Sequence, residues 1–310
     1  MGERAHGISW LSDTAMRGVA AGRAASVLRA MRPLQWVKNA VVLAALVFAA
    51  RLDDPASAVS ALGAVISFCL VSSAVYLLND LHDVDADRLH PEKRTRPIAS
   101  GELPPALAAV SAAALLATGL TVAWAVRPVF AAICVAYAAL MAGYSYRLKS
   151  VAIVDVAIIA VGFVLRAVGG GVAIDVTISN WLLMCTFLLA LFLGFGKRRQ
   201  EFAHLPDAVA HRRNLQHYTL PLLDQLVAAS AAATLVAYAL YTVEARNLAG
   251  QRAMVLTVPI VAFALARYLY LMRRHGGGGS PERVLVSDRP LLAAVAVWGA
   301  VCIVLLWPTG

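Results

Sequence analysis

The fold of this chain is decided by the stretch AVSALGAVISFCLVSSAVYLLNDLHDVDAD, residues 58–87. Its first two thirds form an apolar run of about 20 residues, the length that a helix needs to cross the hydrocarbon core of a bilayer. Its last third turns acidic and contains the residues that we call the acidic motif: Asn79, Asp80, Asp83 and Asp87. The stretch therefore predicts a transmembrane helix that carries a set of oxygen ligands to one face of a membrane.

Similar apolar runs recur along the whole chain. Hydrophobic residues make up 60% of the 310 residues and charged residues only 15%, whereas an ordinary soluble domain is roughly 45–50% apolar. The alternation of a membrane β-barrel is missing, so we expect an all-α integral membrane protein with nine transmembrane helices. The expected spans cover residues 36–50, 58–78, 103–125, 128–145, 151–172, 179–196, 220–242, 253–272 and 289–308.

The placement of the basic residues predicts the orientation. A net charge of +9 would suit a nucleic-acid partner, but most Lys and Arg residues fall in segments that share one side of the membrane with the N-terminus. The loops on the other side contain only Arg51, Arg127, Arg246 and Arg252. Because Lys and Arg mark the cytoplasmic side, we expect a multi-pass protein of the cell (inner) membrane, with a cytoplasmic N-terminus and no nucleic-acid partner.

The N-terminal segment differs in composition from the rest of the chain. Residues 1–30 alternate Ala with Arg and lack the apolar core of a signal peptide. We expect them to form a cytoplasmic segment lying on the membrane surface, followed by one nine-helix domain over residues 31–310. The oligomeric state is left open, and a homo-oligomer is compatible with the sequence.

The acidic motif has the geometry of a metal site. At about 100° per residue, its four members fall within one arc of about 100°, while Asp85 points away. Three carboxylates on one helix face repel one another unless a cation joins them, and hard oxygen ligands suit Mg²⁺, which typically takes one or two carboxylates plus substrate phosphates. The alternative is a solvated acidic helix end, which opposes the helix dipole. We interpret the motif as a Mg²⁺ site.

Two groups of cations follow the acidic motif in the sequence. The first comprises Lys93, Arg94 and Arg96, and an acidic metal site beside cations is what a Mg²⁺-diphosphate requires. The second, which we call the basic motif, comprises Lys197, Arg198 and Arg199. No carboxylate pair accompanies it, so we interpret it as a separate phosphate site, with a lipid-headgroup patch as the alternative.

Several charges fall inside the expected spans. Asp155 and Arg166 share one span but lie about 16 Å apart along it, so we expect Arg166 to line a wet cavity or to pair with another group. Asp224 and Arg267 are single intramembrane charges whose partners the sequence does not identify. The histidines form no recognisable catalytic triad.

These residues support a family resemblance. The acidic motif, followed by Lys-Arg-x-Arg-Pro at 93–97 and by Tyr-Ser-x-x-Leu-Lys at 144–149, resembles the UbiA superfamily of intramembrane prenyltransferases. The resemblance extends over essentially the whole chain. It implies a UbiA-like bundle around a central cavity open to the cytoplasm and to lipid, with a diphosphate substrate bound through Mg²⁺.

One departure points to a narrower group. The aromatic prenyltransferase branch carries a second Asp-rich motif where this chain has Lys-Arg-Arg-x-Glu at 197–201. The segments Arg-Pro-x-Gln-Trp-x-Lys-Asn at 32–39 and Pro-Glu…Asp-Arg at 281–289 are instead similar to the decaprenyl-phosphate phosphoribosyltransferases. That resemblance implies transfer of 5-phosphoribose from phosphoribosyl diphosphate to decaprenyl (polyprenyl) phosphate, releasing diphosphate, for synthesis of arabinan precursors of the cell wall.

Three other functions fit the sequence less well. An aromatic polyprenyltransferase of quinone or haem biosynthesis predicts the second acidic motif that is missing. A transporter or flippase predicts midplane charges in paired halves, and no internal repeat is evident. A purely structural scaffold would leave the acidic motif unexplained.

The inferred substrates set the expected site. Phosphoribosyl diphosphate carries a diphosphate and a separate 5-phosphate, and the acceptor adds a third anion, so one acidic site with surplus cations suits them. We expect the diphosphate and phosphoribose to be bound by Lys38, Arg94, Lys149, Lys197, Arg198, Arg199 and Tyr218. We expect the cavity to be lined by Gln35, Asn39, Tyr144, Asp155, Arg166, Glu201 and Arg212.

Overall fold

The computed structural model describes residues 22–204, 213–244, 252–274 and 281–307, and within these ranges it contains helices and no strand. The chain divides into two compact units. Unit 1 comprises Met1–Leu34 and Leu70–Thr118, and unit 2 comprises Gln35–Cys69 and Gly119–Gly310. One boundary between the units falls near the start of a 3₁₀ helix and the other two fall inside long α-helices, so each unit combines segments that are distant in the sequence.

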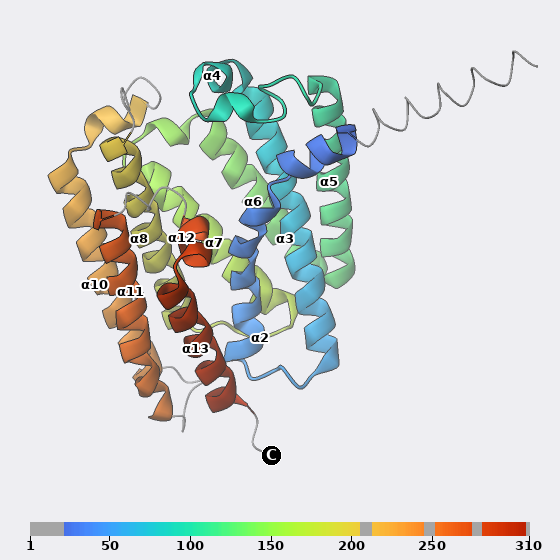
Figure 1. Ribbon diagram of the computed structural model, residues 1–310. Coiled ribbons are helices and arrows are strands. Elements are labelled where there is room, and N and C mark those ends of the chain that lie inside the picture. Colours follow the sequence, from blue (N-terminus) through green and yellow to red (C-terminus); the bar gives the residue numbers. More distant parts are fainter. Residues whose placement is uncertain (1–21, 205–212, 245–251, 275–280, 308–310) are drawn as a thin grey trace, which may run out of the picture. The chain divides into compact units, whose positions relative to one another are not determined.

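Eight helices in the described ranges are long and apolar enough to cross a membrane. They are α3 (Pro55–His82), α5 (Pro105–Val126), α6 (Pro128–Tyr146), α7 (Val154–Ala173), α8 (Asn180–His204), α10 (Leu220–Glu244), α11 (Val258–Arg274) and α13 (Arg289–Leu306) (Figure 1). The all-α membrane fold is thereby confirmed. Each of these helices matches one expected span. A helix satisfies its own backbone hydrogen bonds within lipid, so an apolar run of spanning length folds as a helix.

The first expected span, 36–50, is the exception to this agreement. It consists of a 3₁₀ helix, η1 (Pro33–Leu43), and a short α-helix, α2 (Ala44–Phe48). A 3₁₀ run of this length is uncommon, and contacts with α7 accompany it. A Cβ on Gly170 would lie 2.2 Å from the carbonyl oxygen of Val42, so the α7 backbone packs directly against η1. Tertiary packing therefore sets the conformation here, and the described ranges contain eight helices of spanning length where nine were expected.

Helix ends follow local sequence signals. Asp54 precedes α3, and its carboxylate accepts hydrogen bonds from the amides of Ala56 at 3.1 Å and Ser57 at 3.3 Å. Asp288 caps α13 in the same way, accepting from the amide of Leu291 at 2.9 Å. These side chains satisfy amides that lack partners in the first turn of a helix.

Unit 1 holds the acidic motif on a small apolar core. The short helices α4 (Val84–Leu89) and η2 (Lys93–Thr95) follow α3, and a helical segment over 22–30 precedes η1. Their core residues are Ala30, Leu77, Ile98, Leu103, Ala108 and Ala112. This core holds the loop after α3 in place, and the loop carries the cations of the first group.

Unit 2 contains the remaining spanning helices. Within it α8 packs along both α7 and α10, α6 packs along α7, and α11 packs along α13. The short helix α12 (Pro281–Ser287) leads into α13. The apolar interior of unit 2 contains aromatic side chains, among them Phe192 and Tyr268, whose rings meet edge to face. The polar ends of α7 and α8 are thus held by a packed apolar interior.

Candidate functional site

Two carboxylates of the acidic motif are buried and share one cation. Asp80 and Asp87 are 2% and 3% exposed. Asp80 accepts hydrogen bonds from Arg32 at 2.5 Å and from Nη1 of Arg96 at 3.0 Å. The same Arg96 nitrogen donates to Asp87 at 2.6 Å, and Lys93 Nζ lies 4.0 Å from the other Asp87 oxygen. The motif therefore gathers two anions around a single guanidinium nitrogen.

The backbone explains how Asp80 and Asp87 meet. The sequence predicts one helix through Asp87, whereas α3 ends at His82 and α4 begins at Val84. The Asp83 amide still donates to the Asn79 carbonyl at 2.9 Å, and the Asp87 amide donates to the Asp83 carbonyl at 2.8 Å. Backbone hydrogen bonds thus continue through Asp83, the residue between α3 and α4. Asn79 and Asp83 remain partly exposed.

The cations around these carboxylates are more exposed than the carboxylates themselves. The side chains of Arg32 and Arg96 are each 26% exposed, and that of Lys93 is 40% exposed. Burial raises the pKa of the Asp87 carboxyl, an effect that the charges of Arg96 and Lys93 oppose. Buried anions with partly solvated cations form an arrangement in which one cation can be exchanged for another.

This donor set fits Mg²⁺ bound together with phosphate oxygens. No three His, Cys, Asp or Glu side chains in the described ranges group closely enough to hold a metal by themselves. Mg²⁺ needs fewer protein ligands than that, because it commonly takes one or two carboxylates and completes its octahedron with substrate and water. Asp80 and Asp87, already placed around one positive nitrogen, provide such a pair.

Unit 2 contains a second charged cluster with the opposite arrangement. Arg198 on α8 is 1% exposed. Its Nε donates to Asp155 of α7 at 2.7 Å, and its Nη1 donates to Glu201 one turn further along α8. Tyr218 donates from its hydroxyl to the other Asp155 oxygen at 3.3 Å. We call these four residues the Arg198 network, in which a buried cation lies between two carboxylates.

Arg166 forms a third buried cluster, on α7. Its Nε donates to Asn39 of η1 at 2.8 Å and its Nη2 to the hydroxyl of Tyr137 at 2.7 Å. The guanidinium also lies 4.5 Å from the centre of the Tyr137 ring. Arg166 therefore pairs with neutral oxygens and aromatic rings, as expected for an intramembrane Arg, and it anchors η1 to α7.

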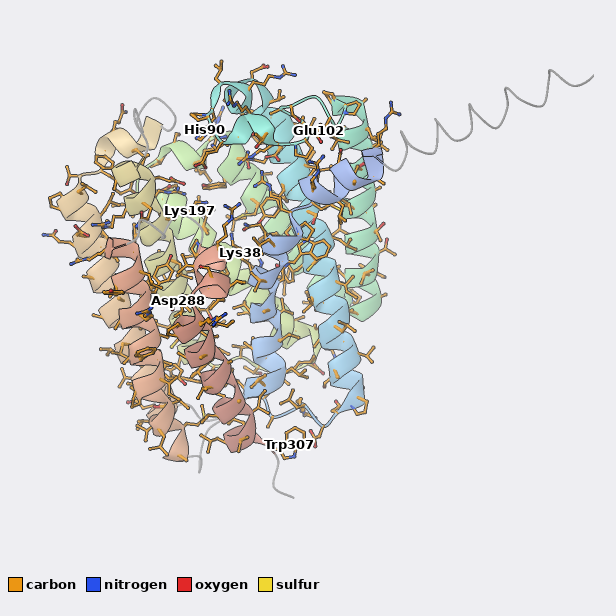
Figure 2. All side chains as sticks on the ribbon, viewed as in Figure 1. Lys38, His90, Glu102, Lys197, Asp288 and Trp307 are labelled. Carbon is orange, nitrogen blue, oxygen red and sulfur yellow. The ribbon has the colours of Figure 1, made fainter. Side chains whose placement is uncertain are left out.

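The other predicted site residues lie on several elements. Lys38 and Gln35 are partly buried on η1, and Lys197 is partly buried on α8 (Figure 2). Tyr144 lies on α6, and Lys149 lies on η3 (Leu148–Ser150), the 3₁₀ turn between α6 and α7. Arg94 is exposed on η2. Arg212 and His211 lie outside the described residues.

The structure identifies ion pairs that the sequence could not. Arg199 donates to Asp224 of α10 at 2.7 Å, so Arg199, like Arg198, has a carboxylate partner. Arg267 contacts Asp288 through two nitrogens, at 2.8 and 3.1 Å. A charge inside an apolar span signals that a partner exists, but only the packing of α8, α10, α11 and α13 shows which one.

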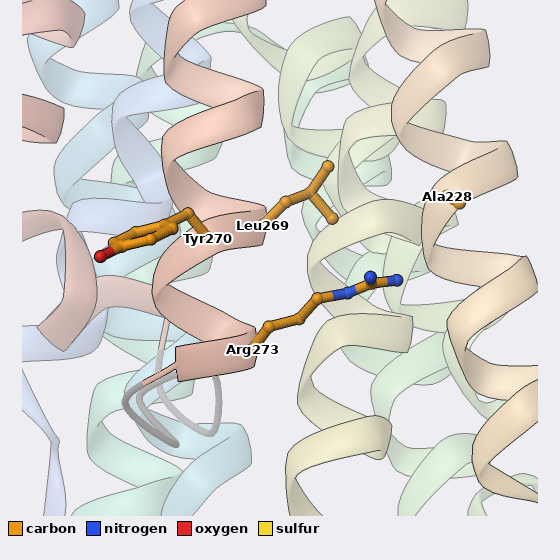
Figure 3. A pocket seen from close by; sticks show the side chains of 4 residues that line it. All are labelled: Ala228, Leu269, Tyr270 and Arg273. Carbon is orange, nitrogen blue, oxygen red and sulfur yellow. The ribbon is translucent and has the colours of Figure 1, made fainter.

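A groove lies between α10 and α11. It has a volume of about 460 Å³ and is lined by Ala228, Leu269, Tyr270 and Arg273. Figure 3 shows Leu269 and Arg273 pointing toward α10, whereas Tyr270 points to the other side of α11. The lining is apolar apart from Arg273, which lies 3.6 Å from Asp224. The groove includes none of the predicted substrate residues.

Comparison with known proteins identifies the family. The model of the UbiA prenyltransferase family matches residues 40–285. The chain belongs to this family. It is similar to a protein named decaprenyl-phosphate phosphoribosyltransferase from Mycobacterium tuberculosis (strain ATCC 25618 / H37Rv), with 36% identity over 93% of this chain and 96% of that protein. A protein of the same name from Corynebacterium glutamicum is 34% identical over 95% of this chain and 90% of its own length.

A solved structure of the family shares the fold. The structure of a UbiA homolog from Archaeoglobus fulgidus bound to GPP and Mg²⁺ superposes with a TM-score of 0.69 at 19% identity, covering 91% of this chain and 99% of that one. At that identity the likeness establishes the architecture of the family fold. The family resemblance expected from the acidic motif is confirmed.

Proposed function

We propose that this UbiA family member transfers 5-phosphoribose from phosphoribosyl diphosphate to a polyprenyl phosphate. The observation that carries the proposal is the similarity, over more than nine tenths of the chain, to proteins named decaprenyl-phosphate phosphoribosyltransferase. The sequence adds support, because the end of α8 carries cations where aromatic prenyltransferases carry a second acidic motif. The product would be a lipid-linked phosphoribose, a precursor for cell-wall arabinan.

The acidic motif is assigned to the diphosphate end of the donor. Asp80 and Asp87 would hold Mg²⁺, with Asn79 and Asp83 beside them. When bound, Mg²⁺ would offset the negative charge that develops on the departing diphosphate. Arg32 and Arg96 now neutralise the buried carboxylates. Both guanidinium groups are partly exposed, and each is suited to bind diphosphate oxygens.

The reaction needs no general base. An oxygen of the acceptor phosphate forms a bond to C1 of the ribose while the bond from C1 to the diphosphate oxygen breaks, and the electron pair of that bond leaves with diphosphate. The acceptor phosphate is largely ionised near neutrality, since its second pKa is about 6. Attack from the face opposite diphosphate inverts C1. The histidines of the chain are therefore not required for proton transfer.

The cations of unit 2 are assigned to the remaining phosphate charge. Lys197, Lys149 and Lys38 are partly buried on α8, η3 and η1 and are the candidates for the 5-phosphate. Arg198 has a different role in this proposal, because it is almost fully buried and lies between Asp155 and Glu201. In this role, the ion pairs of Arg198 hold in place the end of α8 on which Lys197 lies.

The orientation completes the proposal. The acidic motif, η3 and the basic motif all lie in segments that the distribution of Lys and Arg predicts to be cytoplasmic. A water-soluble sugar diphosphate would reach them from the cytoplasm of the cell (inner) membrane, and the polyprenyl tail would remain in the bilayer.

A two-arm assay tests this function. Protein purified in detergent with Mg²⁺ would receive phosphoribosyl diphosphate and decaprenyl phosphate in one arm, and geranylgeranyl diphosphate and 4-hydroxybenzoate in the other. Mass spectrometry of the lipid extract should find a polyprenyl phosphoribose in the first arm and no new lipid in the second. A prenylated aromatic acid without the phosphoribosyl lipid would overturn the proposal.

A further inference from the structure

The chain between η3 and α7 contains a strained turn. Ile153 has φ 68° and ψ −48°, and the Val154 amide donates to the Ala152 carbonyl at 2.7 Å. These values describe a γ-turn with positive φ, a rare and strained conformation. A β-branched residue at positive φ is a genuine outlier, and Ile153 is 50% exposed, so its side chain gains little from burial. Something other than Ile153 itself must stabilise this turn.

Tyr218 makes the contacts that stabilise the turn. The Ile153 amide, which lies at the N-terminus of α7 and has no partner within that helix, donates to the Tyr218 hydroxyl oxygen at 2.5 Å. The same hydroxyl donates its proton to Asp155 at 3.3 Å. Tyr218 is 3% exposed and packs with Leu215 and Leu223 in a cluster that includes Ala152. One hydroxyl thus binds both sides of the turn.

The Arg198 network ties this turn to the end of α8. Asp155, which accepts from Tyr218, also accepts from Arg198 at 2.7 Å, and Arg198 continues to Glu201. The hydrogen bonds run from the Ile153 amide through Tyr218 and Asp155 to α8. The conformation of the turn is therefore coupled to the helix end that carries Lys197.

The turn also sets the direction of η3. Lys149 lies four residues before Ile153, and the intervening backbone is held by hydrogen bonds from the Val151 amide to the Leu148 carbonyl and from the Asp155 amide to the Val151 carbonyl, at 3.2 and 3.1 Å. A change in φ at Ile153 would rotate this short segment as a unit. The position of the Lys149 ammonium group follows from that rotation.

We infer that Tyr218 is a positioning residue, which holds the Ile153 turn so that Lys149 is placed to bind a phosphate of the sugar donor. The inference rests on the proposed function for the identity of that donor. It replaces our expectation that Tyr218 binds phosphoribose directly. The hydroxyl of Tyr218 is buried and already bonded to Ile153 and Asp155, so it acts through the loop.

Three variants separate positioning from direct binding. Tyr218→Phe removes only the hydroxyl, and Ile153→Gly in the same chain lets the turn keep its positive φ without steric conflict. Tyr238→Phe is the matched control, because the Tyr238 hydroxyl is also buried and also makes two side-chain hydrogen bonds, to Thr257 at 2.6 Å and Trp298 at 2.7 Å. Tyr238 lies on α10, about 27 Å along the helix from its start.

Steady-state kinetics gives the first readout. Tyr218→Phe should raise KM for phosphoribosyl diphosphate about tenfold, because the strained turn at Ile153 loses the contact that holds it, with kcat and KM for polyprenyl phosphate nearly unchanged. The double variant with Ile153→Gly should recover most of the wild-type KM, and Tyr238→Phe should leave it unchanged. A raised KM that glycine does not restore would indicate direct substrate contact and overturn the inference, as would an unchanged KM in Tyr218→Phe.

Hydrogen exchange gives a readout that needs no substrate. The peptide covering residues 150–157 should exchange faster in Tyr218→Phe than in the wild type and should return toward the wild-type rate in the double variant. Equal exchange in all three proteins would show that Tyr218 does not hold the turn. A wild-type protein without phosphoribosyl transfer would instead overturn the proposed function, and the exchange rates would still decide the structural half of the inference.

Discussion

The two buried charge clusters have opposite arrangements of charge. In unit 1 two buried carboxylates, Asp80 and Asp87, surround a guanidinium nitrogen of Arg96, and the cations are 26–40% exposed. In unit 2 a buried guanidinium, Arg198, lies between two carboxylates, and its own side chain is 2% exposed. Both clusters satisfy the requirement that buried charges be paired, but only the first leaves its cations in contact with solvent.

This difference separates a binding function from a structural one. A partly solvated Arg or Lys can move aside for a metal ion or a phosphate, because water stabilises it once it has left the carboxylate. A buried Arg cannot, because leaving its partners would strand charges on both sides. We therefore expect substitutions at Asp80 and Asp87 to act mainly on activity, and substitution of Arg198 to act mainly on stability.

The largest effect is expected at Asp80. Asp80→Asn should lower the rate of phosphoribosyl transfer by about a hundredfold to a thousandfold, because it removes one of the two buried oxygen ligands. Product formation measured by mass spectrometry would check this. Asp85→Asn is the matched control in the same segment, because the Asp85 side chain is 89% exposed and contacts only Arg88 at 3.2 Å among the ion pairs of the described chain. Near-normal turnover in Asp80→Asn would remove the metal-site assignment.

The next effect tests the structural cluster. Arg198→Met should destabilise the protein by about 3–5 kcal/mol, the effect of breaking a buried pair from one side, since Asp155 and Glu201 would be left without their cation. The melting temperature and the monodisperse fraction in detergent would measure this loss. Arg199→Gln provides the comparison, because its pair with Asp224 is only partly buried. Equal stability of the two variants would contradict a structural role specific to Arg198.

A third prediction concerns exchange of cations at Asp80 and Asp87. Arg96→Gln leaves these carboxylates short of positive charge, so saturating Mg²⁺ should raise the melting temperature of this variant more than that of the wild type. Binding at about 100 times Kd contributes about 2.7 kcal/mol. Mg²⁺ should not rescue Arg198→Met. Equal Mg²⁺ shifts in wild type and Arg96→Gln would show that Arg96 does not occupy the place of the metal.

The smallest effect is expected at an exposed pair of unit 1. Arg29 and Glu102 form an ion pair with side chains 56% and 44% exposed. Glu102→Gln should change stability by less than about 1 kcal/mol and leave turnover unchanged, because solvent screens such pairs. A thermal melt in detergent measures this directly. A larger loss would mean that pairing alone, without burial, gives an ion pair its importance in this protein.

Much of the site could be predicted from sequence, although roles within it could not. The spacing of the acidic motif placed Asp80 and Asp87 on a common face, and the structure brings both to Arg96. The same sequence treats Lys197, Arg198 and Arg199 as equivalent cations. Burial distinguishes them, and burial depends on how α7, α8 and α10 pack. The Ile153 turn gave no signal, since an isoleucine before a helix does not indicate positive φ.

The sequence by itself determined the membrane class, the positions of eight spans and the face on which the carboxylates gather. Those features depend on hydrophobic length and helical period, which are local properties of the chain. Only the tertiary structure decided that η1 is a 3₁₀ helix and which charges are paired. Arg32 meets Asp80 across 48 positions, Arg198 meets Asp155 across 43, and Arg166 meets Asn39 across 127. A low-dielectric interior requires that each buried charge have a partner, but the choice of partner is made by helix packing.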